Sequence, residues 1–280
     1  MFEPTTPSVT RRSRSVRHGP WRWLAWTFFL YGSPVWGDPA DLDEPATQEA
    51  MQVQIDALNR QIESRPDVAP LYVKRGEAYF KLRELDKAIE DFSKAIRMND
   101  RLDDAYFGRG MALARNGEIE KGIVDLSVYI KRHPKSSHAY TKRGVRYLWN
   151  GDEVNAEKDF SRAIALDPRN AEAHDDLGVI HARRGEHDKA IEHFTTTIRL
   201  DPSYHKAYHN LALVYYLVGR ESQALTAIDA AIKLTPDDRN ALLLKSQILK
   251  ALGLHEQARR VKEDAEFLPA GNWSERLPVR

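Results

Sequence analysis

The sequence predicts an all-α protein, an α-solenoid in which antiparallel helical hairpins stack into a right-handed superhelix. Small residues recur at a spacing of 34 residues, at Gly76, Gly110, Gly144, Gly178 and Ala212. Prolines recur at the same spacing, at Pro134, Pro168, Pro202 and Pro236. Between them, apolar residues return at offsets of three and four, which is the pattern of an amphipathic helix. A fixed period of this length indicates a repeat protein, in which each unit buries its apolar face against the next.

The third copy of the unit shows the pattern most clearly. Tyr140, Gly144 and Tyr147 lie on one stripe of a first helix, because residues three and four apart share a helix face. Asn150 and Gly151 then interrupt the pattern. The unit therefore begins with a helix of about a dozen residues that ends in a tight polar turn.

A second helix follows the turn. Ala156, Phe160 and Ala163 again lie at offsets of four and three. Pro168 ends this helix, because proline has no amide hydrogen to donate and its ring obstructs the preceding turn. Small side chains at Gly144 and Ala156 let the two helices approach closely, while the aromatic residues fill the space between neighbouring hairpins.

These residues resemble the signature of the tetratricopeptide repeat, which runs aromatic, Leu, Gly, aromatic in the first helix and Ala, Phe, Ala and a closing Pro in the second. The resemblance extends from Ala69 to about Asn272. It divides this part of the chain into six copies, with the boundaries 69–102, 103–136, 137–170, 171–204, 205–238 and 239–272. The resemblance implies a scaffold whose first helices line a concave groove that binds a protein or peptide partner.

Two copies depart from the signature in their core positions. The second copy has Gly122, Leu126 and Tyr129 in its second helix, a redistribution of side-chain size that predicts locally different packing. The fourth copy has His174 and His181 in place of both first-helix aromatics. We expect these two histidines to act as planar packing groups with a polar edge.

Both ends of the array have terminal features. The sixth copy has Lys262 where Phe is expected, with Gln247 and Lys250 on its first helix, so it is a degenerate copy with the polar face of a cap. Upstream, the pattern predicts an isolated N-terminal helix at residues 49–68, a half repeat that starts the stack. Residues 273–280 are expected to form a C-terminal tail.

Residues 1–37 resemble a secretory signal peptide. A basic segment precedes the apolar stretch 23–31, which is shorter than the roughly 20 residues that span a bilayer. We expect cleavage after Gly37 and export of the mature protein, which would then be periplasmic or secreted. The alternatives are membrane anchoring through residues 21–37 and a transit peptide or basic tail. Residues 38–48 are expected to form an acidic, solvated linker.

Composition excludes several classes of function. The 280 residues are 42% hydrophobic and 30% charged, which is typical of a soluble globular or helical-repeat protein. Five Arg and one Glu lie in residues 1–37, which leaves 37 basic and 40 acidic residues and no basic stripe for a nucleic acid. The chain has no cysteine, which excludes disulfides, thiolate nucleophiles and cysteine-ligated metals.

Six histidines lie between His174 and His209, which raises the alternative of a metal-dependent enzyme. A metal site needs three or four converging ligands, and two of these histidines hold packing positions of the repeat. His255 and Glu256 begin a zinc-protease pattern, but Arg259 stands at its second histidine. No catalytic constellation and no metal or cofactor motif stands out, so we expect a protein that is not an enzyme.

The candidate binding site is the groove that the resemblance implies, at the second, fifth, ninth and twelfth positions of each repeat. These positions include Phe107, Met111, His138, Thr141, Val145, Leu148, Glu172, Asp175, Val179, Lys206, His209, Leu213 and Tyr216. An apolar floor with charged edges suits an extended segment or a helix of a partner. The expected apolar anchors are Val145, Leu148, Leu213 and Tyr216. The alternative is that the apolar residues pack within the superhelix.

We therefore expect an exported, non-catalytic protein–protein interaction scaffold that binds a partner peptide or protein segment in its concave groove. One alternative is a membrane-tethered assembly factor. The other is a metal-dependent enzyme that uses the histidines from His174 to His209.

Overall fold

The computed structural model describes residues 45–268, and the predicted signal segment 1–37 and tail 273–280 lie outside them. The described residues form thirteen α-helices and no strand, beginning with α2 (Pro45–Ser64). The first helices of six hairpins are α3 (Ala69–Lys81), α5 (Asp103–Arg115), α7 (Ser137–Trp149), α9 (Ala171–Arg183), α11 (His205–Leu217) and α13 (Arg239–Ala251). The second helices are α4 (Leu85–Met98), α6 (Ile119–Arg132), α8 (Glu153–Leu166), α10 (His187–Leu200), α12 (Glu221–Leu234) and α14 (His255–Phe267). None of these thirteen helices combines the length and the apolar character needed to cross a membrane.

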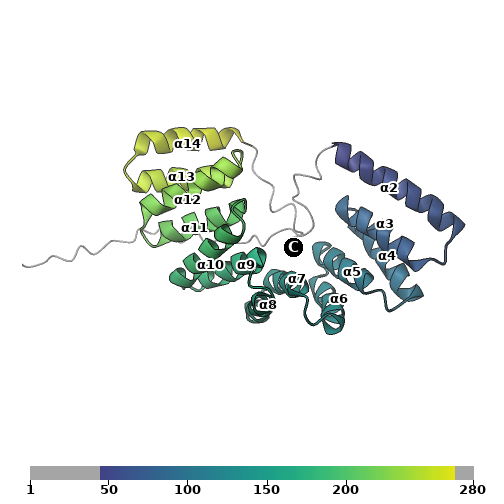
Figure 1. Ribbon diagram of the computed structural model, residues 1–280. Helices are drawn as coiled ribbons and strands as arrows, with labels where there is room; N and C mark the ends of the chain where they lie inside the picture. Colours follow the sequence, from purple (N-terminus) through teal and green to yellow (C-terminus); the bar gives the residue numbers. More distant parts are fainter. Residues whose placement is uncertain (1–44, 269–280) are drawn as a thin grey trace, which may run out of the picture.

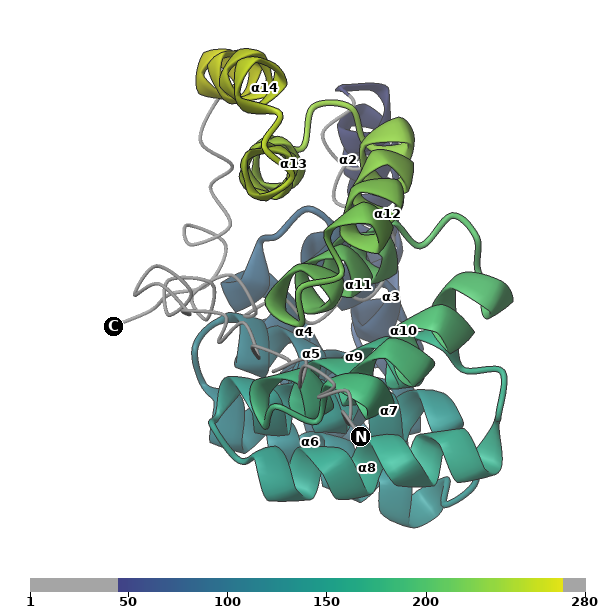
Figure 2. The ribbon, with the colours of Figure 1, turned by 90° about the vertical axis from the view of Figure 1, so that its left-hand side faces the viewer.

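The hairpins stack side by side into a curved array (Figure 1). Each first helix packs against its own second helix and against the preceding hairpin, and α3 packs in the same way against α2. In the middle of the array α5, α7 and α9 lie on the inner side of the arc, and α6 and α8 lie on the outer side. The helix axes change direction along the stack, as a comparison of α8 with α13 and α14 in Figure 2 shows. The predicted all-α solenoid of stacked hairpins is confirmed.

Helix α2 begins earlier than the sequence predicts. It starts at Pro45, so residues 45–48 of the predicted acidic linker are helical. Proline is tolerated in the first turn of a helix, because an amide there has no partner within the helix. Leu58 and Ile62 belong to the same buried cluster as Tyr72 of α3, so α2 covers the N-terminal end of the array.

Each hairpin closes around a small residue of its first helix. Gly144 and Gly178 face the rings of Phe160 and Phe194, and a Cβ at either glycine would lie 2.7 Å from the ring. Both rings are fully buried, at 0% exposure. A carbon–carbon separation of this size lies well inside van der Waals contact, so only glycine fits opposite phenylalanine without movement.

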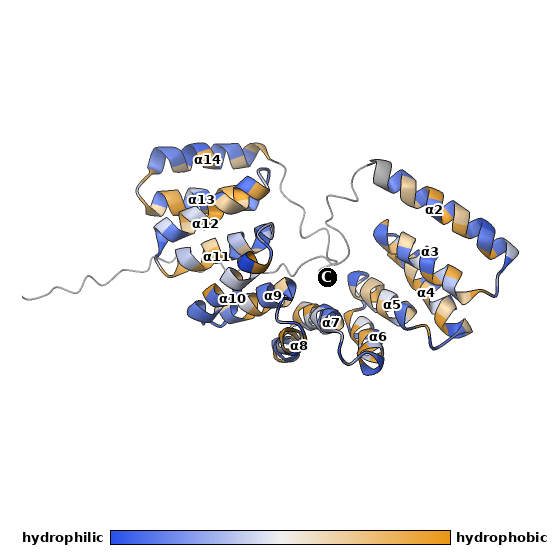
Figure 3. Ribbon diagram, viewed as in Figure 1, coloured by the Kyte–Doolittle hydropathy of each residue, from blue (hydrophilic) through white to orange (hydrophobic). Residues whose placement is uncertain are grey.

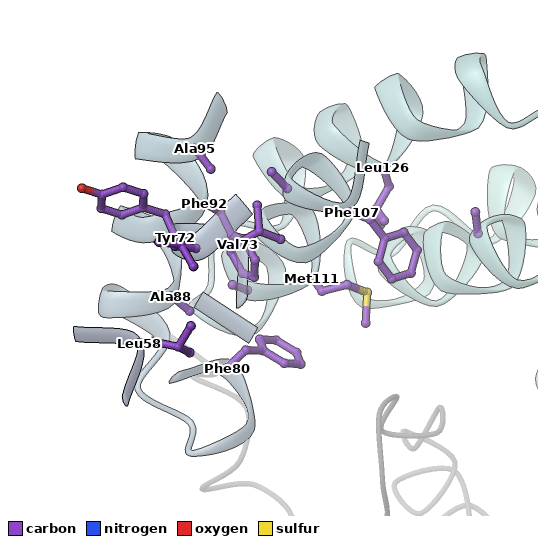
Figure 4. Close-up of a cluster of buried hydrophobic side chains, with 14 of the residues drawn as sticks. Leu58, Tyr72, Val73, Phe80, Ala88, Phe92, Ala95, Phe107, Met111 and Leu126 are labelled. Carbon is purple, nitrogen blue, oxygen red and sulfur yellow. The ribbon is translucent and has the colours of Figure 1, made fainter. Parts of the chain in front are cut away.

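The second hairpin packs differently, as its residues predict. A Cβ at Gly110 would lie 2.9 Å from the carbonyl oxygen of Gly122, so the two helices meet through their backbones. Leu126 fills the place of the ring and is fully buried. Gly108 leaves room for Phe92 of the preceding hairpin, whose ring would lie 2.4 Å from a Cβ there. Figure 4 shows Phe92 and Leu126 in this N-terminal part of the core.

Buried ion pairs link the hairpins in the N-terminal half of the array. An arginine of the first helix makes two bonds of 2.7–2.9 Å to an aspartate of the second helix, in the pairs Arg75–Asp91, Arg109–Asp125 and Arg143–Asp159. A third nitrogen of each arginine donates to the second helix of the preceding hairpin or to α2, at Asn59, Ser93 and Ser127. We call these groups the ion-pair ladder. Removing one member of such a buried pair costs about 3–5 kcal/mol, so the ladder holds successive hairpins in register.

The last helix, α14, makes few apolar contacts. Ala258 and Ala265 are its buried residues. Most of its length is hydrophilic in Figure 3. A helix that ends a repeat array needs this character, because no further hairpin covers its outer face.

The contact between the two helices of a hairpin can be tested in the fourth hairpin. We expect Gly178→Ala to lower the free energy of unfolding by about 1–3 kcal/mol, because the new Cβ overpacks against Phe194. Adding Phe194→Ile should recover most of the loss, since the fifth hairpin has Ala212 and Ile228 at these positions and buries both fully. Urea denaturation of the two single variants and the double variant measures the coupling. Losses that simply add in the double variant would contradict this steric account.

Candidate functional site

The thirteen residues predicted for the groove lie on four consecutive first helices, α5, α7, α9 and α11. Seven of them are buried, at 7% exposure or less: Phe107, Met111, Thr141, Val145, Asp175, Val179 and Leu213. Val145 and Leu213, predicted as anchors for a partner, belong to core clusters of the array instead. This corrects their assignment, because neighbouring helices close over both side chains. For these two residues the alternative of packing within the superhelix holds.

The other six predicted groove residues reach the surface. They are His138, Leu148, Glu172, Lys206, His209 and Tyr216. His138 stacks on the ring of Phe107, with the ring centroids 5.6 Å apart. Of the predicted apolar anchors, Leu148 and Tyr216 are therefore accessible to a partner, and charged groups of both signs lie on the same helices.

A pocket of about 460 Å³ lies at the N-terminal end of this face. Its lining comes from α3, from the start of α5 with the loop before it, and from the end of α6: Pro70, Val73, Lys74, Glu77, Arg101, Leu102, Asp103, Asp104 and His133. Burial, together with the nearby charge of Asp104, raises the pKa of Glu77. Val73 and Glu77 hold the fifth and ninth positions of the first copy, so the hollow continues the line of predicted groove positions.

Five charged residues are packed together in the middle of the array, on the first helices α7 and α9. They are Lys142 and Arg146 of α7 and Glu172, Asp175 and Asp176 of α9, and we call them the central charged cluster. Four of them are nearly inaccessible, with exposures of 3% for Lys142, 1% for Arg146, 0% for Asp175 and 1% for Asp176. Lys142 Nζ donates to a carboxylate oxygen of Glu172, which ties the two helices together.

Much of the hydrogen-bonding capacity of this cluster is unused. Within residues 45–268, no partner reaches Arg146 Nε, Glu172 Oε1, Asp175 Oδ2 or either carboxylate oxygen of Asp176. Asn210 of α11 donates to the other oxygen of Asp175 at 3.4 Å. A buried polar atom without a partner costs about 1–3 kcal/mol, so the stability of the fold does not account for this arrangement.

Burial also shifts the ionisation of the cluster. It raises the pKa of Asp175 to about 7. It raises the pKa of Asp176 well above its usual range, and the negative charges of Glu172 and Asp175 act in the same direction. On α7, burial lowers the pKa of Lys142 and lowers that of Arg146 to about 9. These four groups are all pushed toward their neutral forms, which is the behaviour of an unsatisfied electrostatic site.

Sequence analysis identifies only Glu172 and Asp175 of this cluster, and it places Asp175 on an exposed edge, whereas the side chain is fully buried. A comparison of equivalent positions in the copies would have revealed Arg146. Arg146 stands where the neighbouring copies have Ala112 and Ile180. Residues that break a structural pattern at a cost in stability mark functional sites.

His174 and His181 of α9 pack with His193 of α10 into a stack of three imidazole rings. Nδ1 of His174 lies 3.1 Å from Nδ1 of His193. The rings of His181 and His193 are nearly parallel, at 12°, with their centroids 5.3 Å apart. Nδ1 of His181 also lies 3.2 Å from a carboxylate oxygen of Glu186. Among the described residues, no group of three or more His, Asp or Glu is placed to hold a metal ion.

The histidine stack takes the place of the ion-pair ladder in the fourth hairpin. Leu177 and His193 stand where the three preceding hairpins have arginine and aspartate. Burial lowers the pKa of His193 to about 4, and the neighbouring imidazoles of His174 and His181 add to this shift. Burial lowers the pKa of His174 as well. His174 and His193 are therefore neutral at neutral pH. The fourth hairpin has no ion pair equivalent to those of the ion-pair ladder.

Comparison with family models identifies repeats of one kind along the array. Tetratricopeptide repeat models match the chain at residues 69–101, 104–136, 142–205 and 181–248. These matches span the first to the sixth predicted copy. No curated protein sequence matches the chain.

Solved structures resemble this one in fold. A chain of the APC/C hetero-tetramer Cut9–Hcn1 aligns with a TM-score of 0.68 at 18% identity, over 85% of this chain and 46% of that chain. A tetratricopeptide repeat protein from Parabacteroides merdae aligns with a TM-score of 0.65 at 18% identity, over 85% of this chain and 93% of that one. YrrB, described as a TPR protein with an unusual peptide-binding site, aligns with a TM-score of 0.52 at 22% identity, over 67% of this chain and 97% of that one. The present chain thus spans less than half of the Cut9–Hcn1 chain, and at these identities the likeness establishes the fold alone.

The histidine stack predicts a specific response to acid. His193 stays neutral in the folded protein down to about pH 4, whereas an unfolded histidine binds a proton below about pH 6.5. Its contribution to the free energy of unfolding therefore falls as the pH drops through this window. The substitutions His174→Tyr, Leu177→Arg, His181→Tyr and His193→Asp install the residues of the third hairpin. We expect this variant to gain roughly 1–2 kcal/mol relative to the wild type between about pH 7 and about pH 5, after allowance for solvent screening.

Urea denaturation of both proteins at the two pH values measures this gain. The raised pKa of Asp175 has the opposite effect and favours the folded state as the pH falls. Both proteins contain Asp175, so the difference between their free energies of unfolding isolates the stack. His255→Tyr, at an exposed histidine outside the stack, is the matched control for the loss of a histidine. A four-residue variant whose advantage is the same at both pH values would contradict the expectation.

Proposed function

The chain belongs to the tetratricopeptide repeat family, and we propose that it is a non-catalytic scaffold that binds a segment of a protein partner along its concave face. The central charged cluster is the observation that carries this proposal. It buries charged side chains with unused hydrogen-bonding atoms in the middle of the inner helices. Such groups weaken a fold, so their presence favours a role in recognition.

The accessible residues beside the cluster favour a peptide-like partner. Leu148 of α7 and Tyr216 of α11 offer apolar and aromatic contact area, and Glu172 and Lys206 lie near the starts of α9 and α11. Interfaces commonly combine a few apolar or aromatic anchors with charged groups that set orientation. A segment that lies across α7, α9 and α11 would meet both kinds of group.

The partner would also strengthen the electrostatic interactions of the cluster. A bound segment excludes water from above Glu172 and Lys206, and charges interact more strongly where water is excluded. Since the cluster holds groups of both signs, a partner with correctly placed charges gains affinity and a wrongly placed charge is rejected. Selection by charge pattern is therefore part of the proposed function.

We further propose that the protein acts after export, with residues 1–37 as a cleaved signal peptide. The basic segment followed by the short apolar stretch 23–31 supports this proposal. A tethered form, held in a membrane through residues 21–37, is the competing arrangement. The concave face would bind its partner in the same way in either form.

Site-specific photo-crosslinking tests the concave face as the binding surface. We expect p-benzoylphenylalanine at Leu148 or Tyr216 to form an adduct with a partner protein when the full chain is expressed in its own cells. Val124 and Val154, on α6 and α8, are the matched controls, since they are 61% and 60% exposed on the outer helices. Mass spectrometry of the adducts identifies the partner. The same adduct from Val154 as from Leu148 and Tyr216 would rule out selective binding on the inner helices.

N-terminal sequencing of the protein from fractionated cells tests export. The mature chain is expected to begin at Asp38 and to appear in the exported, soluble fraction. A chain that retains residues 21–37 and sediments with membranes would contradict cleavage and favour the tethered form.

A further inference from the structure

Arg115, at the C-terminal end of α5, is an arginine without a counter-ion. The other arginines of residues 45–268 that are at least partly buried bond to a carboxylate or carbonyl oxygen, whereas Arg115 has neither an ion pair nor a hydrogen bond. Its guanidinium lies over the ring of Phe80 in the first hairpin, 5.1 Å from the centroid. Asp86, at the start of α4, accepts a hydrogen bond from the adjacent Asn116 at 3.0 Å rather than from Arg115.

Arg83 lies in the turn after α3, where its charge acts on Arg115 and its backbone conformation costs energy. Its amide donates to the carbonyl oxygen of Phe80 at 3.1 Å, as the amide of Gly117 does to that of Ala114 in the next hairpin. The φ angle of Arg83 is 60°, in the left-handed region. The five later hairpins have glycine at this turn position, at Gly117, Gly151, Gly185, Gly219 and Gly253. A residue with a side chain costs about 1–2 kcal/mol in this conformation, so the arginine is kept where glycine would be more stable.

Arg146 of the third hairpin is a further buried arginine that lies over an aromatic ring. Its guanidinium lies over the ring of Trp149, 4.6 Å from the centroid. The residue is 1% exposed. Its Nε has no partner, and its one hydrogen bond is a long contact of 3.4 Å to the carbonyl oxygen of Lys142. Arg83, Arg115 and Arg146, from three successive hairpins, are here called the arginine edge.

The charges of the arginine edge act against one another. Burial lowers the pKa of Arg115 to about 10, and the charge of Arg83 acts in the same direction. The charge of Arg115 likewise opposes that of Arg146, while Glu172 and Asp176 partly compensate Arg146 from α9. A guanidinium that rests on an aromatic ring has its planar fork of donors free for a carboxylate. The arrangement therefore lacks an anion.

We propose that the arginine edge is a subsite for one carboxylate side chain of the partner segment. The proposal rests on the proposed binding of a partner along the concave face and adds the chemistry of one of its residues. Arg83 and Arg115 have no carboxylate partner within residues 45–268. Of the acidic groups that act on Arg146, Glu172 is already paired with Lys142, and Asp176 is pushed toward its neutral form. The arginine edge therefore carries an excess of positive charge. A carboxylate of the partner reduces that excess, whereas the acidic residues of α9 disfavour the second negative charge of a phosphoryl group.

Peptide selection on the full chain tests this subsite. Random dodecapeptides displayed on phage are selected on the immobilised protein, and one enriched peptide is synthesised with a fluorophore. We expect the peptide to contain an Asp or Glu whose change to Asn or Gln weakens binding about tenfold. Arg115→Ala should weaken binding of the acidic peptide by a similar factor and should not weaken binding of the amide form further.

Control variants separate charge from folding. Arg115→Met keeps aliphatic bulk over Phe80 and should behave as Arg115→Ala does, with an unchanged circular dichroism spectrum. Arg162→Ala removes the same charge from an exposed position on α8 and should change binding less than twofold. Equal effects of Arg162→Ala and Arg115→Ala would overturn the proposal. Tighter binding, by about tenfold or more, of a peptide with phosphoserine in place of the acidic residue would overturn the assignment to a carboxylate.

Tyr216→Ala distinguishes a failure of this proposal from a failure of the proposed function. Peptides whose binding depends on Tyr216 but not on Arg115 would overturn the arginine edge alone. Peptides whose binding depends on neither residue would overturn binding along the concave face, and the subsite with it. Dependence on both residues is the expected result.

Discussion

The contact of a small residue in each first helix with the group opposite it sets the distance between the two helices of a hairpin, and the rest of the structure depends on that distance. Gly178 admits the ring of Phe194, and Gly110 admits the backbone of Gly122. Different residue pairs thus satisfy one steric constraint. Because each hairpin keeps a close approach, successive hairpins stack in the same way and their first helices form one continuous inner face.

Electrostatic interactions divide this regular array into unlike parts. Arg75, Arg109 and Arg143 carry the ion-pair ladder through the first three hairpins, where a large core cluster also lies. The ladder ends at the fourth hairpin, where Leu177 and His193 replace its members. The central charged cluster lies at the same place, between the two larger core clusters. In the middle of the array, polar groups without hydrogen-bond partners therefore replace stabilising ion pairs. Proteins show this pattern at sites of recognition.

Much of the fold follows from residue types at fixed spacing, and less of the site does. The 34-residue period predicts every hairpin, and Gly122 with Leu126 predicts the distinct packing of the second one. Burial contradicts the groove assignment for Val145 and Leu213, which lie in the core. A helical period shows which residues share a face, but it does not show how closely the next helix covers that face.

The sequence by itself determined the repeat unit, its register and the solenoid. Periodic apolar and small residues act locally, and every copy has the same residue types at the same spacing. Only the tertiary structure decided which polar residues are buried together. Arg146, Asp176 and Arg115 are ordinary charged residues in the sequence, and their environment arises when three neighbouring first helices pack side by side. Burial and the absence of a counter-ion belong to that packing, so the chemistry of the candidate site appears only once the helices are in place.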